Sequence, residues 1–117
     1  MGGPRVLLVE DEGLVAMMME DLLADLGCEV VGSCDSIASA LEWLDGAKDG
    51  LDGAVLDVNL GGELVYPVAE VLAARQIPFA FTTGYGVLPE GRFEAVTILT
   101  KPVNLAKLEA AVRAFGG

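Results

Sequence analysis

The sequence predicts an α/β fold: a doubly wound, five-stranded parallel sheet with helices on both faces. Short apolar runs alternate with segments whose apolar residues recur every three or four positions. Several of these runs end in polar or charged residues, which is where open α/β sheets form their ligand crevice. The chain has 117 residues, 53% of them hydrophobic, so we expect one domain over residues 1–117.

The expected strands are short apolar runs bounded by glycine, proline or polar residues: 5–9, 28–33, 53–57, 77–81 and 95–99. The central run carries a carboxylate, Asp57, at its last position. Burying an unpartnered carboxylate is costly, so we expect Asp57 at the carboxyl edge of the sheet. An aspartate that only caps a turn would give the same local pattern.

Four helices are expected, with boundaries marked by glycine, proline and capping residues: Gly13 and Gly27, Asp35 or Ser36 and Gly46, Pro67, and Asn104. A further helix, before the fifth strand, would be short or disordered, because residues 85–91 hold two glycines and a proline. The expected inward faces are Val15, Met18, Met19, Leu22 and Leu26; Ile37, Ala40, Leu41 and Leu44; Val68, Val71 and Leu72; and Leu105, Leu108, Val112 and Phe115.

Composition excludes several classes of function. Seven basic and eighteen acidic residues give a net charge of −11, which repels nucleic acid and anionic lipid. No apolar run reaches the length of a membrane span, and no signal peptide precedes the first strand, so we expect a cytoplasmic protein without nucleic-acid or membrane partners. The sequence has no histidine, which excludes Ser-His and Cys-His nucleophiles.

The two cysteines, Cys28 and Cys34, flank one expected strand. Six residues of extended chain separate them by roughly 20 Å, whereas a disulfide spans a Cα separation of at most about 7 Å. We therefore expect both thiols to be reduced, and without histidine the pair does not make a zinc site.

Polar groups follow four of the five expected strands: Glu10 and Asp11, Asp57, Thr83, and Lys101. In a parallel sheet these strand ends share one edge, so the groups should meet. Three neighbouring carboxylates repel one another, and Mg²⁺ is a hard cation that takes oxygen ligands. Together with a lysine and a hydroxyl, the set suits a phosphoryl group, with a carboxylate as the nucleophile.

These residues, in this order and strand context, resemble the receiver domain of two-component response regulators over essentially the whole chain; the matching positions are Glu10-Asp11, Asp57, Thr83 and Lys101-Pro102. The resemblance implies a flavodoxin- and CheY-like sheet with strand order 2-1-3-4-5. It also implies that Asp57 accepts a phosphoryl group from a phosphohistidine on a sensor histidine kinase or a histidine phosphotransfer protein. Such a domain is not an enzyme, since it catalyses only its own phosphorylation and dephosphorylation.

The same resemblance assigns the remaining site residues. Mg²⁺ would be bound by Asp11, Asp57 and the backbone carbonyl of Asn59, with Glu10 acting through water. Thr83 and Lys101 would bind the phosphoryl oxygens, and the Lys101–Pro102 bond would be cis.

The chain departs from the common receiver pattern in two places. Ile98 replaces the usual aromatic switch residue, and Gly61 replaces the common proline four positions after the phosphoacceptor. The run Phe81–Tyr85 resembles the Phe-Ala-Thr-Gly subclass of single-domain receivers that lack the aromatic switch. We therefore expect ordering of the 84–91 loop, and not rotation of a ring, to transmit phosphorylation.

Interaction with partners is expected on the first helix. One helix cannot bury three consecutive methionines, so Met17, together with Leu14, should stay partly exposed and contribute to a docking patch for a partner's helical hairpin. A homodimer also remains open.

Three other functions fit parts of the pattern. A haloacid-dehalogenase-type phosphatase also combines Asp, Thr, Lys and Mg²⁺, but it needs a carboxylic acid at the position of Asn59. A flavodoxin-like cofactor binder would need a phosphate loop where this chain has Glu10-Asp11-Glu12. A degenerate receiver that serves only for docking is disfavoured by the complete set of site residues.

Overall fold

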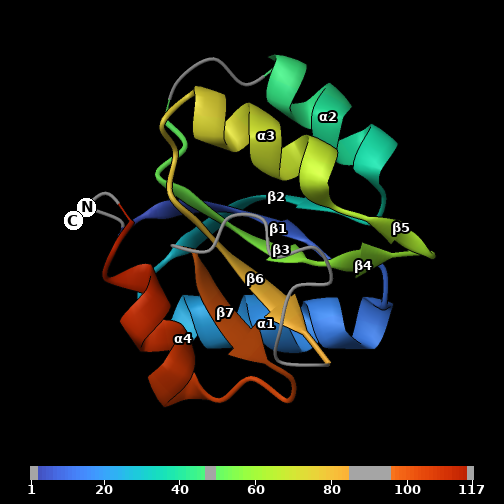
Figure 1. Ribbon diagram of the computed structural model, residues 1–117. Helices are drawn as coiled ribbons and strands as arrows, with labels where there is room; N and C mark the ends of the chain where they lie inside the picture. Colours follow the sequence, from blue (N-terminus) through green and yellow to red (C-terminus); the bar gives the residue numbers. More distant parts are fainter. Residues whose placement is uncertain (1–2, 47–49, 85–95, 116–117) are drawn as a thin grey trace.

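The computed structural model describes residues 3–46, 50–84 and 96–115. In this part of the chain, five strands form one parallel sheet in the order β2-β1-β3-β6-β7 (Figure 1). The strands are β1 (Arg5–Val9), β2 (Glu29–Cys34), β3 (Gly53–Asp57), β6 (Phe79–Thr83) and β7 (Thr97–Thr100). This order confirms the predicted fold class and strand arrangement.

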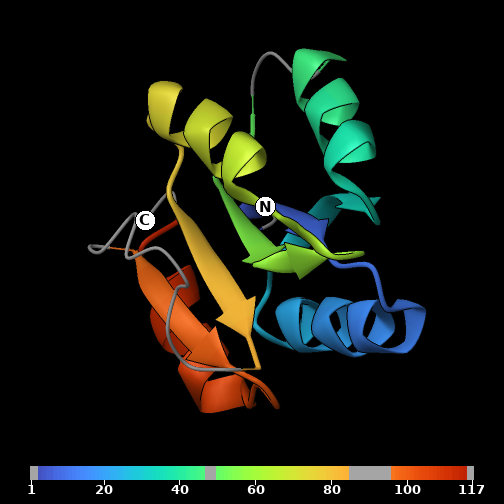
Figure 2. The ribbon, with the colours of Figure 1, turned by 45° about the vertical axis from the view of Figure 1, so that its right-hand side comes forward.

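Helices cover both faces of the sheet, as the alternating pattern predicts. One face carries α1 (Gly13–Asp25) and α4 (Leu105–Val112), and the other carries α2 (Ile37–Gly46) and α3 (Tyr66–Ala74) (Figures 1 and 2). Among the described residues, no helix is both long and apolar enough to span a membrane. The predicted loop at 85–91 lies outside the described residues.

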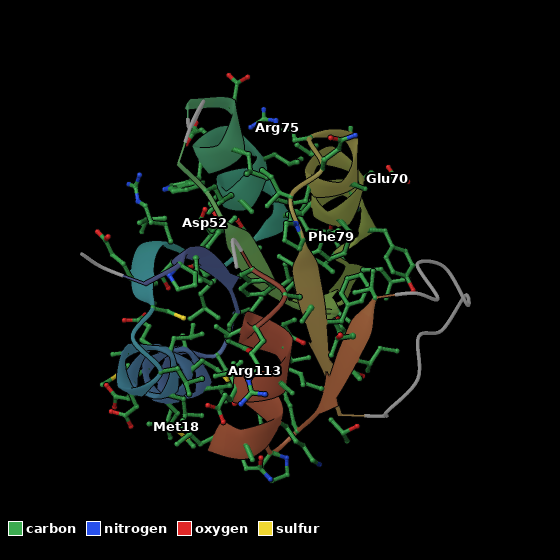
Figure 3. The ribbon with its side chains drawn as sticks, turned by 90° about the vertical axis from the view of Figure 1, so that its left-hand side faces the viewer. Met18, Asp52, Glu70, Arg75, Phe79 and Arg113 are labelled. Atoms are coloured by element: carbon green, nitrogen blue, oxygen red, sulfur yellow. The ribbon has the colours of Figure 1, made fainter. Side chains whose placement is uncertain are left out.

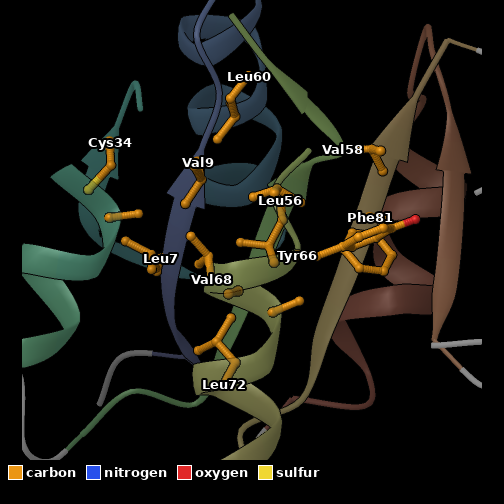
Figure 4. Packing of buried hydrophobic residues seen from close by; sticks show 14 of the residues in the cluster. Leu7, Val9, Cys34, Leu56, Val58, Leu60, Tyr66, Val68, Leu72 and Phe81 are labelled. Atoms are coloured by element: carbon orange, nitrogen blue, oxygen red, sulfur yellow. The ribbon is translucent and has the colours of Figure 1, made fainter. Parts of the chain in front are cut away.

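The central strand separates two hydrophobic cores. All five residues of β3 are buried, which is typical of a parallel strand covered on both faces. Because neighbouring side chains in a strand point to opposite faces, Ala54 and Leu56 pack toward α2 and α3, while Val55 packs toward α1 and α4. Figure 4 shows the first of these cores, in which Leu56 and Phe81 lie beside α3.

The fourth strand of the sheet, β6, begins and ends later than predicted. We expected residues 77–81, but β6 is Phe79–Thr83. Pro78 has no N–H to donate to the ladder, so regular pairing begins after it. The shift places Thr82 and Thr83 inside the strand, and both are buried.

The predicted starts of helices α2, α3 and α4 agree with the structure. The Ser36 hydroxyl accepts the N–H of Ser39 at the start of α2, and the Asn104 side chain accepts the N–H of Lys107 at the start of α4. Pro67 lies in the first turn of α3.

Two of the predicted inward faces need correction. The buried face of α1 is formed by Ala16, Met19 and Leu23, which leaves Met18 on the edge of the helix with 54% of its surface exposed (Figure 3). Leu105 lies to one side of the buried face of α4 and is 42% exposed. Both were predicted to point inward. Leu14 and Met17 are exposed, as predicted.

A short hairpin after β3 was not predicted. Strands β4 (Asn59–Leu60) and β5 (Glu63–Leu64) pair antiparallel through Gly61 and Gly62, whose φ angles are +58° and +90°. Two consecutive positive φ angles are the signature of a type I′ turn, for which Gly-Gly is a favoured sequence. The paired glycines were therefore a usable signal for the hairpin.

Candidate functional site

The candidate site lies at the carboxyl edge of the sheet, where four strands deliver polar groups. Glu10 follows β1, Asp57 ends β3, Thr83 ends β6, and Lys101 follows β7. The strands run parallel, so these ends meet at one edge (Figure 1). The backbone N–H of Lys101 donates to the carbonyl of Thr83 over 2.9 Å, which fixes the turn after β7 against β6. The Lys101–Pro102 bond is cis, as the family resemblance implied.

Lys101 connects two buried carboxylates. Its Nζ lies 3.0 Å from Oε1 of Glu10 and 3.3 Å from Oδ2 of Asp57. The side chains of Glu10 and Asp57 are 2% and 7% exposed, against 26% for Lys101, so the lysine reaches from the rim into a poorly solvated site. Burying a carboxylate is costly unless it is paired, and this lysine supplies the pairing charge.

The electrostatics of the site favour a further positive charge. Burial, and then the negative charge of Glu10, raise the pKa of Asp57 to about 6, although Lys101 acts to lower it. Burial acts to lower the pKa of Lys101, but its hydrogen bond to Glu10 and the charge of Asp57 outweigh this effect, and the pKa is raised. One ammonium group therefore does not offset the carboxylates around it.

The carboxylates can converge on one ion. Glu10, Asp11 and Asp57 each offer an oxygen, and these oxygens lie within 4.8 Å of one another. The donors are all carboxylate oxygens with an excess of negative charge, which fits a hard divalent cation such as Mg²⁺. The predicted acidic residues are thus brought together.

Asn59, the remaining predicted metal-site residue, lies beside the cluster. Its backbone N–H donates to Oδ1 of Asp57 over 3.4 Å, and its side-chain oxygen accepts the N–H of Gly62 over 3.0 Å. The Asn59 side chain is therefore engaged in the hairpin turn. It is not placed as the general acid that a dehalogenase-type phosphatase would need.

One residue beside the site was overlooked in the sequence. Thr82 pairs in register with Asp57 and lines a cavity of about 290 Å³ together with Glu10 and Lys101. Because adjacent side chains in a strand face opposite sides, a pair of threonines at a strand end could have indicated that both faces carry a hydroxyl.

The rest of this cavity is apolar and opens beside α1. Its walls are Val15, Met18, Met19, Leu22, Pro102 and Val103. The exposed side chains of Leu14, Met17 and Met18, here called the α1 patch, lie on the same helix. An apolar surface therefore borders the ionic site.

The cysteines lie outside the site residues. Cys28 and Cys34 are free and buried, which confirms the prediction that they form no disulfide. Burial raises the pKa of both thiols, so neither is an activated nucleophile.

Comparison with known proteins identifies the class. A family model described as the response regulator receiver domain matches residues 6–113. The chain belongs to this family, which confirms the resemblance found in the sequence.

Two solved structures are similar to this chain over nearly its whole length. The solution structure of SdrG from Sphingomonas melonis Fr1 is 45% identical and superposes with a TM-score of 0.82, covering 96% of this chain and 95% of SdrG. The BeF3-activated conformation of SdrG from Pseudomonas melonis Fr1, also 45% identical, has a TM-score of 0.74, with 97% and 98% covered.

A curated relative is longer than this chain. The Phyllosphere-induced regulator PhyR of Methylorubrum extorquens is 29% identical over 111 residues, which make up 92% of this chain and 42% of that protein. The chain thus spans about two fifths of the length of this relative.

Proposed function

We propose that this chain is a phosphorelay receiver in which Asp57 accepts a phosphoryl group from a phosphohistidine. The donor would be a sensor histidine kinase or a histidine phosphotransfer protein, and the signal would pass on through protein contacts. The observation that carries the proposal is the arrangement of Asp57 between Lys101, 3.3 Å away, and the acidic cluster with Glu10 and Asp11. Membership of the receiver family supports it.

The residues divide into two groups by role. Asp11, Asp57 and the backbone carbonyl of Asn59 would hold Mg²⁺, and Glu10 would act through water. When bound, the ion would offset negative charge on the phosphoryl oxygens. Thr83 and Lys101 would bind the other phosphoryl oxygens, for which a hydroxyl and an ammonium group are suitable donors.

Phosphoryl transfer is a displacement at phosphorus. An ionised Asp57 oxygen forms the new P–O bond while the P–N bond of the phosphohistidine breaks, and the imidazole leaves with the bonding electron pair. The pKa of about 6 leaves Asp57 largely ionised at neutral pH. The contribution of the protein is to orient the carboxylate and to offset charge. No other substrate is turned over, so the chain is not an enzyme in the usual sense.

The donor protein would dock on the α1 patch. Leu14, Met17 and Met18 are more than half exposed, and Met18 also lines the apolar cavity whose lining includes Lys101. A helix with an apolar face could cover this surface and bring its phosphohistidine toward Asp57. The net charge of −11 favours a donor with basic residues around that face.

The location and extent of the domain follow the same reasoning. We propose that residues 1–117 form one receiver domain acting in the cytoplasm. The family match over residues 6–113 supports the domain assignment.

Intact-mass spectrometry with acetyl phosphate tests the proposal. The wild type should gain one phosphoryl group with Mg²⁺ and none with EDTA. Asp57→Asn should gain none, whereas Asp45→Asn, which changes an exposed aspartate on α2, should behave as the wild type. Beryllofluoride binding is measured in parallel, so that the result of the test does not depend on acetyl phosphate alone. If the wild type neither gains mass nor binds beryllofluoride with Mg²⁺, the chain is not a working receiver.

A further inference from the structure

We propose that the backbone N–H of Gly61 positions Asp11 for the metal ion, so that the β4–β5 hairpin and the metal site form one coupled unit. Oδ2 of Asp11 accepts the N–H of Gly61 over 2.8 Å, across fifty positions of sequence. Within the described part of the chain, this is the only hydrogen bond to the Asp11 carboxylate. The inference rests on the proposed function, since it concerns the same metal site.

The bond matters because Asp11 is exposed, whereas Glu10 and Asp57 are buried. Packing holds the two buried carboxylates, but an exposed aspartate would sample several rotamers. A carboxylate has two oxygens with several lone pairs, so an N–H bound to Oδ2 restricts the side chain and leaves Oδ1 available for a cation. Groups that orient a metal ligand in this way are part of the metal site.

Gly61 suits this role for two reasons. Its φ of +58° lies in the left-handed region, which turns its N–H toward the loop after β1. A Cβ added at this position would meet nothing within 4 Å, so backbone conformation and not space restricts the residue. A proline, the residue common here in the family, has no N–H and a φ fixed near −65°.

The other side of the same turn is tied to Asp57. The N–H of Gly62 donates to the side chain of Asn59, and the N–H of Asn59 donates to Asp57 over 3.4 Å. The type I′ turn therefore connects two carboxylates of the acidic cluster, Asp11 and Asp57, through short hydrogen-bonded steps. An ion that holds both carboxylates should stabilise the hairpin, and a hairpin that holds both should strengthen binding of the ion.

Two substitutions of Gly61 test its N–H and its left-handed conformation: one removes both, and the other keeps both. Gly61→Pro removes the donor and the left-handed conformation, whereas Gly61→Asn keeps the N–H, and asparagine tolerates positive φ in type I′ turns. Mg²⁺ titration by calorimetry should give a dissociation constant about 10-fold higher for Gly61→Pro, the lower end of losses seen when orienting groups are removed. Gly61→Asn should bind nearly as the wild type.

A second measurement does not depend on the proline variant folding. In the metal-free wild type, NMR should show slow solvent exchange of the Gly61 amide, and Asp11→Ala should speed it. Mg²⁺ should slow exchange in the wild type further. A folded Gly61→Pro variant with wild-type affinity, or a Gly61 amide indifferent to both Asp11→Ala and Mg²⁺, would overturn the inference. A wild type that binds no Mg²⁺ would overturn the proposed metal site as well.

Discussion

The ammonium group of Lys101 donates a hydrogen bond to the buried carboxylate of Glu10 over 3.0 Å, slightly shorter than its 3.3 Å approach to Asp57. Without a metal ion, the lysine is thus shared between the acidic cluster and the candidate phosphoacceptor. A phosphoryl group on Asp57 would compete with Glu10 for the same lysine.

Removing this lysine should destabilise the fold. Lys101→Met leaves the carboxylates of Glu10 and Asp57 buried without their counter-charge, which should lower the free energy of unfolding at neutral pH by about 1–3 kcal/mol, a value below that of a fully buried pair because Lys101 is partly exposed. Urea unfolding without divalent cations measures the change. Lys107→Met, at an exposed position of α4, is the control and should change little. Equal losses in the two variants would contradict the pairing role.

The raised pKa of Asp57 predicts how stability depends on pH in the absence of metal. Between the ordinary pKa of 3.8 and about 6, the folded protein retains a proton on Asp57 that the unfolded chain has released. The stability that the folded protein gains from this retained proton is therefore fully present below pH 3.8 and is lost as the pH rises through about 6. Between pH 3.8 and about 6, the charged groups near Asp57 are Glu10, Asp11 and Lys101.

The Asp57→Asn variant measures how much the titration of Asp57 contributes to stability. The variant lacks the titrating group, so its stability should exceed that of the metal-free wild type at neutral pH by on the order of 1–3 kcal/mol. The difference should shrink as the pH is lowered, and it should also shrink when Mg²⁺ is added to the wild type. Thermal or urea unfolding across the pH range would reveal it. A constant difference at every pH would mean that Asp57 does not titrate in this way.

A glycine in the central strand should be intolerant of any side chain. A Cβ on Gly53 would overlap the ring of Phe115, which is buried in the core between the sheet and helices α1 and α4. Gly53→Ala should therefore cost about 1–3 kcal/mol of unfolding free energy through overpacking. Gly13→Ala is the matched control, since nothing lies within 4 Å of its Cβ and alanine favours the helix that starts there. Similar unfolding midpoints for the two variants would show that Phe115 can move away.

The α1 patch should affect transfer from a protein donor and not from a small molecule. Met17→Lys places a charge on a surface that a donor helix would cover, so transfer from a phosphorylated kinase or phosphotransfer protein should slow by about 10-fold, as for loss of one strong interface residue. Phosphorylation by acetyl phosphate should be unchanged. Leu105→Lys, on the exposed side of α4, is the control. Unchanged protein-to-protein transfer in Met17→Lys would remove the patch from the donor interface.

The sequence predicted the sheet well because its signal is local. Short apolar runs, which predict strands, alternate with segments in which apolar residues recur with the helical period of 3.6. This alternation places Asp57 at the end of a buried strand and does not depend on the details of packing. The same local logic found the caps at Ser36 and Asn104. It failed for Met18, because the direction of a helix face depends on how the helix rotates against the sheet.

The sequence alone determined the fold class, the family, and the residues that gather at the carboxyl edge, because strand alternation and chain order fix which ends meet. Tertiary structure decided which atoms touch. Lys101 pairs with Glu10 across 91 positions of sequence, and Gly61 donates a hydrogen bond to Asp11 across fifty. Thr82 lines a cavity together with both Glu10 and Lys101. Such contacts depend on strand register and turn geometry in three dimensions, which no local pattern of residues encodes.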